Sequence, residues 1–443
     1  MSIENKISNK NANVAIIGLG YVGLPIFLSL LHSKNNYTVH GIDTDICKIE
    51  SLKKGKSYIK DIPDKELFDK MLNKQWYLST NYSSIKYCDI ILICVPTPVD
   101  KVAPLSKTSF SSYSPDLSYV NSVITSIIDN FGNNDKLIIL KSTVSPTTTD
   151  TVINLKLYDS LQKNQKYHLA FAPERENPAD KNFNLKNTPM VVGGVTKQAG
   201  ELAKTFLKSI SDDIILLSDS RHAEMVKILE NTFRFVNISL INEIKKICDI
   251  CSMDIWEIIE GAKTKPFGFM PFYPCAGIGG HCIPVDPYYL QDLFLQKGSH
   301  SRFIEASNFI NQEAILNLLM AIKTECNHFS SNPKEFKPNV LLLGIAYKPN
   351  INDARNSSAL DIFERLYLRR FNVKYIDPYV PEIKVKGKTF KSETYSSDML
   401  QQQDLVVLMT DHDYFDADFI IENSEKIFDT RGFFPKHAKV VRV

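Results

Sequence analysis

A glycine-rich segment that leads into a cysteine is the most unusual stretch of this sequence. From Gly277 to Asp286 it runs GIGGHCIPVD, which places Asp286 four residues after Cys282. The glycines leave the backbone room to approach a ligand and leave the thiol uncrowded, and a helical segment would put both side chains on one face. A thiolate is a strong nucleophile, but most cysteines are buried apolar residues. The segment by itself therefore favours a structural role.

A second glycine pattern predicts a dinucleotide site. The segment GLGYVG closes an apolar run and opens a helical one. In such a loop the first glycine permits a tight turn, the second lets the backbone approach a pyrophosphate, and the third lets the helix pack closely. The pyrophosphate lies on the N–H groups of the helix N-terminus. A purely structural turn is the alternative. The expected cofactor loop consists of Gly18, Gly20, Tyr21, Val22 and Gly23.

The acid that follows this loop indicates which cofactor binds. Asp43 comes twenty residues after Gly23, where a carboxylate can accept hydrogen bonds from both ribose hydroxyls. Its negative charge would repel a 2′-phosphate, so NAD is favoured over NADP. NAD and a thiol together can oxidise an aldehyde through a thioester. The dinucleotide site therefore favours a catalytic interpretation of Cys282.

Short apolar runs alternate with helical stretches in the first half of the chain, which predicts a parallel α/β sheet covered on both faces. Ligands of such sheets bind at the carboxyl ends of the strands, where the segments VPTP (95–98) and KSTV (141–144) lie, although turn chemistry explains either one alone. The stretch 101–115, rich in Ser, Pro and Lys, is expected to be a loop. The expected strands are Val14–Gly18, Tyr37–Ile42, Asp89–Val95, Lys136–Lys141, His168–Ala172 and Met190–Gly193.

The pattern changes in the middle of the chain and then returns. Arg221–Cys251 and Phe303–His328 have near-helical apolar spacing, which predicts long helices that could form a dimer spine. A linker is expected at Ser330–Pro338, and a helix at Ser357–Arg369 with Ser357 or Ser358 as its N-cap. The chain is thus predicted to contain a sheet domain (1–215), a helical middle (216–332) and a second sheet domain (333–443). Further strands are expected at Asn339–Ala346, Val373–Ile376, Leu405–Thr410 and Lys426–Asp429.

Composition disfavours several other classes of protein. The chain has 443 residues, of which 44% are hydrophobic and 23% charged, and a formal net charge of +2. These values are ordinary for a globular protein and disfavour nucleic-acid binding through bulk charge. No apolar run approaches the roughly 20 residues that cross a bilayer, so we expect no membrane association. The eight cysteines form no metal-site or disulfide pattern, so we expect no metal and a cytoplasmic location.

At the level of motifs, the chain resembles the UDP-glucose/GDP-mannose dehydrogenase family from about Val14 to Arg431. The matching segments are GLGYVGLP, CVPTP, KSTV, PERENP, EMVKILENTF, GGHCIPVDPYYL and GIAYKPNINDARNSSALDI, while TKPFGFMPFYP is similar to the UDP-N-acetylhexosamine branch. The resemblance implies an α/β fold with two Rossmann-like doubly wound domains, one binding NAD and one a UDP-sugar, joined by a helical central domain with a long helix. It also implies a cytoplasmic homodimer that oxidises the sugar C6 alcohol to a carboxylate with two NAD⁺ and one water.

The resemblance assigns roles to individual residues. Cys282 matches the nucleophile, and Asp286 matches the carboxylate that assists proton transfer. Lys227 matches the ammonium group that stabilises alkoxide charge, and Asn231 matches a donor to the same oxygen. The remaining catalytic residues, which position the hydrolytic water, are Thr143 and Glu174.

Binding residues are also implied by the resemblance. Lys48 stands where relatives often have Arg, which weakens a planar contact to the adenosine. The NAD contacts added to the glycine loop and Asp43 are Lys48, Pro96, Thr97, Ser142, Thr143 and Arg355. The UDP-sugar contacts are Glu174, Arg175, Lys227, Asn231, Lys265, Phe267, Gly279, Lys348 and Arg431, with the loop 174–178 around the first two.

These residues favour a UDP-N-acetylhexosamine 6-dehydrogenase, with UDP-N-acetylglucosamine (UDP-GlcNAc) as the first substrate candidate. UDP-glucose 6-dehydrogenase is the runner-up, with the same chemistry. A catalytically silent nucleotide-binding scaffold is the alternative from another class, but it would need neither Cys282 nor Lys227. Cys275 stands where relatives often have Gly, so a second thiol lies seven residues before the proposed nucleophile.

Overall fold

The computed structural model describes residues 2–31, 36–59, 62–72, 74–101, 113–175, 183–328 and 337–443. They form two compact units. The first unit contains Met1–Glu230 and Tyr288–His300, and the second contains Asn231–Pro287 and Ser301–Val443. Helix α8 (Ser220–Ile250) begins in the first unit and continues into the second. Helix α10 (Asp286–Gln296) lies mostly in the first.

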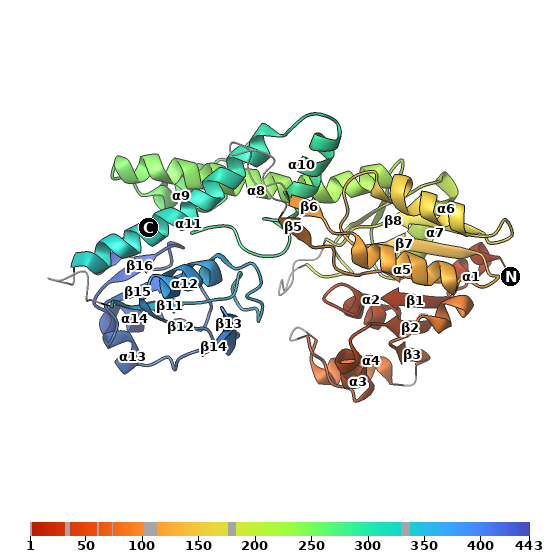
Figure 1. Cartoon of the computed structure of the whole chain (residues 1–443), viewed down its shortest axis with the longest axis horizontal. Helices are drawn as coiled ribbons and strands as arrows, with labels where there is room; N and C mark the ends of the chain where they lie inside the picture. The colour runs from red at the N-terminus through yellow and green to blue at the C-terminus, as the bar shows by residue number, and fades with distance from the viewer. Residues whose placement is uncertain are drawn as a thin grey trace. The chain divides into compact units, whose positions relative to one another are not determined.

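An eight-stranded sheet forms the centre of the first unit (Figure 1). Its order is β10-β9-β8-β7-β4-β1-β2-β3, and the pairs are parallel except β8 with β9. The strands are β1 (Asn13–Ile17), β2 (Thr38–Ile42), β3 (Trp76–Ser79), β4 (Ile90–Ile93), β7 (Lys136–Leu140), β8 (Tyr167–Phe171), β9 (Met190–Gly194) and β10 (Ile214–Leu216).

Both faces of this sheet are covered by helices. Val14 and Ile16 of β1 pack into one apolar cluster, and the alternate residues Ala15 and Ile17 pack into another. This double burial explains why the strand sequences are apolar throughout. The first cluster receives α1 (Ile3–Ser8), α2 (Gly23–Leu30), α3 (Ile46–Lys53), α4 (Asp64–Met71) and α7 (Lys197–Leu207), and the second receives η1 (Ser83–Tyr87), α5 (Ser118–Asp129), η2 (Thr149–Asn154) and α6 (Leu155–Ser160).

The register of the sheet brings four strand ends together at one edge. Ile17 pairs with Ile93, Ile93 with Leu140, and Leu140 with Phe171. The loops that leave β1, β4, β7 and β8 therefore start side by side at the carboxyl edge, where ligands of open α/β sheets bind.

A smaller parallel sheet forms the core of the second unit, in the order β12-β11-β15-β16-β17. Helices α11 (Arg302–His328) and α12 (Ser358–Leu368) pack on one face, and α13 (Ser397–Gln401) and α14 (Ala417–Asn423) on the other. The strands are β11 (Asn339–Leu343), β12 (Asn372–Ile376), β15 (Leu405–Leu408), β16 (Ile427–Asp429) and β17 (Val440–Arg442), and a separate hairpin pairs β13 (Glu382–Val385) with β14 (Lys388–Lys391).

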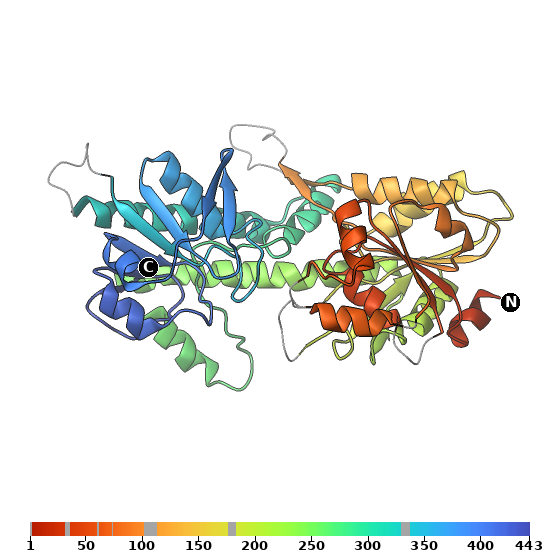
Figure 2. The ribbon, with the colours of Figure 1, turned by 90° about the horizontal axis from the view of Figure 1, so that it is seen from below.

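The helical part of the second unit is built on α8, which Figure 2 shows as one long, unbroken helix. Its sequence contains no Gly or Pro, so nothing in it interrupts the backbone hydrogen bonds. Helix α9 (Ile255–Lys263) packs against it through an apolar cluster. The buried members of that cluster are Ile241, Cys248, Ile255, Trp256 and Ile259.

The predicted fold class is confirmed: the first unit contains a mostly parallel α/β sheet, the second contains a parallel α/β sheet and most of the long helix, and each predicted strand overlaps an observed one. Ser357 is the N-cap of α12, where its hydroxyl accepts from the Ala359 amide. The ends of the predicted loop at 101–115 pair as β5 (Val99–Lys101) and β6 (Tyr113–Pro115), while residues 102–112 and most of the linker at 330–338 lie outside the described residues. Within the described ranges, no helix is long and apolar enough to cross a bilayer.

Candidate active site

The glycine loop after β1 has the geometry of a phosphate cradle. Gly18 has φ +90°, and a Cβ at this position would lie 2.6 Å from the Cys94 carbonyl oxygen. A Cβ at Gly23 would lie 1.8 Å from the Gly18 oxygen, so only glycine allows α2 to start this close to the strand. A Cβ at Gly20 would meet no atom within 4 Å, which leaves open space beside the loop. The three glycines thus serve a turn, a ligand approach and a helix contact, which fits a bound dinucleotide.

Asp43 faces this loop from the end of β2. Its Oδ2 accepts from the Leu19 amide at 2.9 Å and from Lys48 Nζ at 3.1 Å, and its Oδ1 accepts from the Asp45 amide at 2.9 Å. Tyr58 donates its hydroxyl to the Leu19 carbonyl, and Lys48 Nζ lies 5.9 Å from the centre of the Tyr58 ring. The predicted pair of Asp43 and Lys48 therefore lies together at the glycine loop.

The segments after β4 and β7 are joined to each other by hydrogen bonds. Thr97 Oγ1 donates to the Thr143 carbonyl at 2.7 Å, and Ser142 Oγ donates to the Val95 carbonyl at 2.7 Å. The hydroxyl of Tyr289, on α10, donates to the Thr97 carbonyl. Pro96, between these contacts, is exposed. The predicted residues Thr97, Ser142 and Thr143 thus form one cluster at the carboxyl edge of the sheet.

Lys227 reaches the same edge from helix α8. Its Nζ donates to the Glu174 carbonyl at 2.7 Å, just after β8. The Glu174 carboxylate accepts from the Arg175 amide at 2.9 Å and lies 3.6 Å from the buried Nζ of Lys141. Arg175 forms an ion pair with Glu230 of α8 at 2.6 Å and donates to the Pro189 carbonyl. The structure thus gives Arg175 protein partners, while residues 176–178 of the predicted loop lie outside the described part.

Glu224, one turn before Lys227 on α8, fixes the loop that follows Thr143. Its carboxylate is buried and accepts from the amides of Thr147 at 2.6 Å and Thr149 at 2.8 Å. Thr147 has φ +85°, which is strained for a β-branched residue. Burial raises the pKa of Glu224 to about 7, against the lowering effect of these hydrogen bonds. Glu224 and Lys227, one turn apart on α8, therefore position the segment after β7 and the segment after β8, respectively.

Cys282 lies in the second unit, in a turn that ends at the start of α10. The Asp286 amide donates to the Cys282 carbonyl at 2.7 Å. The helix begins only at Asp286, so the segment is not helical through Cys282, and the condition under which helical spacing would place both side chains on one face is not met. Pro284 explains this, because it favours the first turn or the approach to a helix. The buried Asn231 Nδ2 donates to the buried Asp286 Oδ2 at 2.6 Å.

The glycines before Cys282 pack tightly inside the second unit. A Cβ at Gly280 would lie 3.0 Å from the ring of Tyr347, and a Cβ at Gly279 would lie 3.1 Å from its Cβ. The Gly280 amide donates to the Asn356 carbonyl at 3.1 Å. Cys275 is held separately, because its amide donates to Asn242 Oδ1 on α8 at 2.9 Å. The segment is thus anchored by its backbone on both sides of Gly279.

The other predicted binding residues lie elsewhere in the second unit. Lys348 is in the loop after β11, whose Ile345 and Ala346 amides donate to Asp377 at 2.7 and 2.9 Å. Arg355 is mostly exposed and forms an ion pair with Asp353 at 2.6 Å. Lys265 lies over the ring of Phe267, which is 71% exposed.

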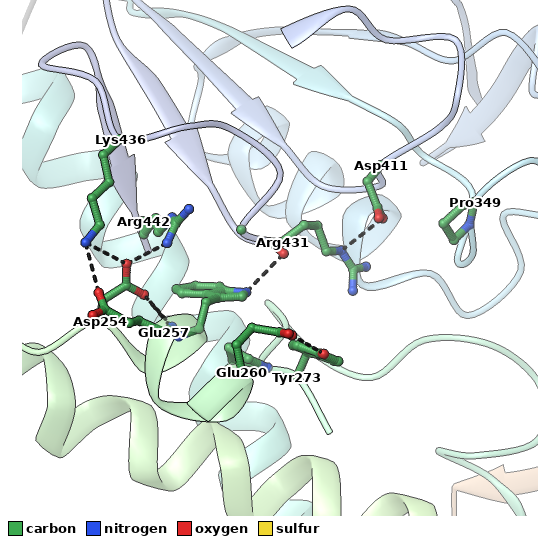
Figure 3. Close-up of a pocket in the computed structure, with 12 residues that line it drawn as sticks. Asp254, Glu257, Glu260, Tyr273, Pro349, Asp411, Arg431, Lys436 and Arg442 are labelled. Carbon is green, nitrogen blue, oxygen red and sulfur yellow. Dashed lines mark hydrogen bonds and ion pairs between the residues drawn. The ribbon is translucent and has the colours of Figure 1, made fainter. Parts of the chain in front are cut away.

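Arg431 lines a pocket of about 670 Å³ in the second unit (Figure 3). Its Nε donates to the Met409 carbonyl at 2.8 Å and lies 4.0 Å from Asp411. Pro349 also lines the pocket. Two further lining residues contact each other, since Glu260 accepts from the Tyr273 hydroxyl at 2.6 Å. The lining residues are Asp254, Trp256, Glu257, Glu260, Tyr273, Pro274, Pro349, Asp411, Arg431, Gly432, Lys436 and Arg442.

Several residues of these clusters were not predicted as site residues from the sequence. The sequence does contain a signal for Glu224, because it lies three residues before Lys227 and therefore shares its helix face. Lys141 is a charged residue at the end of an apolar strand, which is also unusual. Tyr58, Tyr289 and Trp256 have no local pattern that marks them. Among the described side chains, no group of three or more His, Cys, Asp or Glu could hold a metal ion.

Comparison with known proteins identifies one family whose three domains match most of this chain. The UDP-glucose/GDP-mannose dehydrogenase family is matched by its NAD binding domain at residues 12–211, its central domain at 221–313 and its UDP binding domain at 341–436. A UDP-N-acetyl-D-mannosamine dehydrogenase of Methanococcus maripaludis is 31% identical over 427 residues, covering 95% of this chain and 92% of the relative. A UDP-N-acetyl-D-glucosamine 6-dehydrogenase of Pseudomonas aeruginosa is 31% identical over 378 residues, covering 84% of each chain.

A solved structure has the same overall architecture. The UDP-D-ManNAc dehydrogenase of Pyrococcus horikoshii superposes with a TM-score of 0.81 over 96% of both chains, at 28% sequence identity.

Proposed function

The chain belongs to the UDP-glucose/GDP-mannose dehydrogenase family and is an NAD-dependent nucleotide-sugar dehydrogenase, and we propose that it oxidises the C6 alcohol of a UDP-N-acetylhexosamine to the carboxylate. The observation that carries this proposal is the placement of Cys282. Its carbonyl accepts from the amide of Asp286, whose buried carboxylate in turn accepts from Asn231. A thiol in the turn that leads directly into this acid, which an amide donor holds in place, suits covalent capture of an aldehyde.

For NAD, the residues that would hold the dinucleotide are the glycine loop and Asp43. The amides at the start of α2 can receive the pyrophosphate, and the open space beside Gly20 gives it room. Asp43 can accept from the ribose hydroxyls, while Lys48 and the Leu19 amide hold it at the loop. When bound, NAD⁺ accepts a hydride from the reacting carbon in each of the two oxidations.

The thiol and its neighbours account for the covalent part of the reaction. The Cys282 thiolate adds to the aldehyde carbon and forms a C–S bond, which gives a thiohemiacetal. Oxidation of this species leaves a thioester on Cys282, and water then cleaves the C–S bond, giving the carboxylate and the free thiol. Asp286 accepts and returns the protons of these steps, and Asn231 donates to the substrate O6 as well as holding Asp286 in place.

The family resemblance assigns the charge-stabilising and the water-positioning roles of this proposal to three further residues. Lys227, already a donor to the Glu174 carbonyl, stabilises the negative charge that develops on O6. Thr143 and Glu174 orient the water that attacks the thioester. Their segments follow neighbouring strands, β7 and β8, and both are tied to α8.

We assign the pocket at Arg431 to the nucleotide end of the substrate. Its guanidinium Nη atoms have no hydrogen-bond partner among the described residues, so they can bind oxygens of a UDP group. The volume of about 670 Å³ suits a nucleotide. This assignment agrees with the UDP binding domain matched at residues 341–436.

Two N-acetylhexosamines are the candidate substrates. The sequence motifs favour UDP-GlcNAc, and the relatives named for N-acetylmannosamine make UDP-N-acetylmannosamine (UDP-ManNAc) the second candidate. UDP-glucose oxidation remains the runner-up reaction. We also propose a cytoplasmic location, because all eight cysteines are unbridged thiols and the nucleophile requires a reducing compartment.

We propose further that the protein is a homodimer. Apolar residues follow one another on α8 at Phe233, Leu240, Ile244 and Ile247, and all are exposed. Helix α11 has a similar exposed row at Phe309, Leu316 and Met320. Apolar spacings of seven, four and three residues are typical of helix–helix contacts.

The test is NADH production with UDP-GlcNAc, UDP-ManNAc, UDP-N-acetylgalactosamine and UDP-glucose side by side. We expect an N-acetylhexosamine to have the highest kcat/KM, with two NADH formed per sugar and no lasting free aldehyde. One NADH per sugar, with aldehyde in solution, would remove the thioester mechanism. A protein that binds NAD but forms no NADH with any of the four sugars would be a silent scaffold.

A further inference from the structure

Trp256 forms one wall of the Arg431 pocket and contacts the backbone of Arg431 directly. The indole Nε1 donates to the Arg431 carbonyl at 3.0 Å, a bond that Figure 3 draws as a dashed line. The next residue, Gly432, has φ +70°, and a Cβ there would lie 2.4 Å from indole atoms. The ring therefore packs directly onto the Arg431–Gly432 peptide.

An ion pair between α9 and the last strand fixes Trp256 in turn. Asp254 is the N-cap of α9, and its Oδ1 accepts from the Trp256 amide at 3.0 Å. Its Oδ2 accepts from Arg442 Nη1 of β17 at 2.6 Å. The Arg442 guanidinium also lies 5.3 Å from the centre of the indole ring, so it holds the ring as well as the helix end.

These contacts restrain Arg431 on both sides of its Cα. The Arg431 amide donates to Asp429 Oδ1 at 2.9 Å, its carbonyl accepts from Trp256, and its Nε donates to the Met409 carbonyl at 2.8 Å. Only the outer Nη atoms are left without a hydrogen-bond partner among the described residues. A guanidinium held in this way loses little conformational freedom when it binds a ligand.

We infer that Trp256 is a positioning residue that presents the Arg431 guanidinium to the nucleotide of the UDP-sugar. This inference rests on the proposed function of the pocket. Trp256 contributes to substrate affinity through Arg431, and because the nucleotide is remote from C6, it contributes little to the chemical steps.

The chain offers a matched control for testing Trp256. It has two tryptophans, and Trp76 also donates its indole N–H to one backbone carbonyl, that of Met71 at 2.9 Å in the first unit. Trp256→Phe and Trp76→Phe each remove one such hydrogen bond and keep an aromatic ring. UDP binding by the full-length protein is measured by calorimetry. We expect Kd to rise by about 3- to 10-fold for Trp256→Phe and to stay within about two-fold of the wild type for Trp76→Phe.

Kinetics and fluorescence separate positioning from a structural role. Trp256→Phe should raise KM for the UDP-sugar by a similar factor while kcat stays within about two-fold. In Trp76→Phe, the remaining indole is Trp256, so a UDP titration should change its emission. If Trp256→Phe does not fold, Gly432→Ala takes its place, because the added Cβ displaces the same contact, and it should weaken UDP binding by about 10-fold or more.

The outcomes distinguish this inference from the proposed function. UDP binding of Trp256→Phe equal to that of the wild type, with Arg431→Ala much weaker, would overturn the role of Trp256 and keep the pocket. If Gly432→Ala is used instead of Trp256→Phe and binds UDP normally, while Arg431→Ala binds it much more weakly, the role of Trp256 is likewise overturned and the pocket assignment is kept. A wild-type protein that does not bind UDP, or an Arg431→Ala variant that binds it normally, would overturn the pocket assignment and with it this inference.

Discussion

Asp43 links the glycine loop to the choice of cofactor. We expect Asp43→Ala to weaken NAD⁺ binding by about 10- to 100-fold, because the ribose loses a charged acceptor. Discrimination against NADP⁺ should also relax, since Lys48 loses its ion-pair partner and becomes available to a 2′-phosphate. The measurement is the Kd of each cofactor by calorimetry. Asp69→Ala, at an exposed position of α4, is the control and should change neither value. A wild type that prefers NADP⁺ would refute the interpretation of Asp43.

Cys282 and Cys275 allow the nucleophile to be tested within one segment. Cys282→Ser should lower uronate formation by about 10³-fold or more, because a hydroxyl is a poor nucleophile at neutral pH and a poor leaving group from an ester. The fold and NAD⁺ binding should remain. Cys275→Ser should stay within about two-fold of wild-type turnover, since Cys275 is anchored to Asn242 by its backbone amide.

The readout for both cysteine variants is steady-state uronate formation together with the thermal melting temperature. Each variant is the control for the other, since the substitution is the same and only the position differs. Inactive Cys275→Ser with active Cys282→Ser would show that the nucleophile is assigned to the wrong cysteine.

At the scale of elements, helix α8 and the loop after β7 are coupled by Glu224. Burial raises the pKa of Glu224 to about 7, and the nearby Asp150 acts in the same direction. Because this pKa lies above the ordinary value of 4.5, the folded protein binds the proton more tightly than the unfolded chain. The stabilising contribution is complete below pH 4.5 and is lost as the pH rises through about 7.

We therefore expect the wild type to lose about 3 kcal/mol of unfolding free energy relative to Glu224→Gln between pH 4.5 and 8. The glutamine stays neutral, so the difference isolates this group, while Arg221 and Asp150 are present in both proteins. Urea unfolding at four pH values measures the difference. Glu201→Gln, at an exposed site on α7, should show no such trend. A difference between wild type and Glu224→Gln that does not change with pH would contradict the prediction.

At the scale of the whole molecule, the proposed dimer depends on the exposed row of α8. Ile247 is 53% exposed in the isolated chain, and a lysine there would place a charge in the interface. We expect Ile247→Lys to weaken the dimer by at least about 10-fold in Kd and to leave secondary structure unchanged. Leu155→Lys on α6 is the matched control, because Leu155 is also 53% exposed. Sedimentation velocity measures both. A monomeric wild type, or an Ile247→Lys protein that dimerises normally, would contradict the proposal.

The organisation into domains is also a feature of the whole molecule, and it was predicted from the sequence. Two sheets and a long central helix follow from the alternation of apolar runs and helical stretches, and both sheets are observed. The boundaries at 215/216 and 332/333 stay a prediction. Both observed units contain parts of the predicted middle, because α10 packs with the first unit while α9 and α11 pack with the second.

Local features of this protein were determined by the sequence itself. The glycine loop, the apolar strands and the Ser357 cap each depend on residues within a few positions of one another, whose conformational and hydrogen-bonding preferences are intrinsic. The family motifs also implied the roles proposed for Cys282 and Lys227, because each of these motifs is a short segment that the sequence alone reveals. The substrate-binding role of Arg175, expected on the same basis, stays a prediction, whereas its ion pair with Glu230 joins residues 55 positions apart, and no local pattern predicts it.

Only the tertiary structure decided which residues became partners. Asn231 and Asp286 are 55 residues apart, Glu224 and Thr147 are 77 apart, and Trp256 and Arg431 are 175 apart. Periodicity gives the buried face of a helix or strand, but it does not say which other element will cover that face. The partners are set by strand register and close packing, which depend on the complete set of contacts in the folded chain.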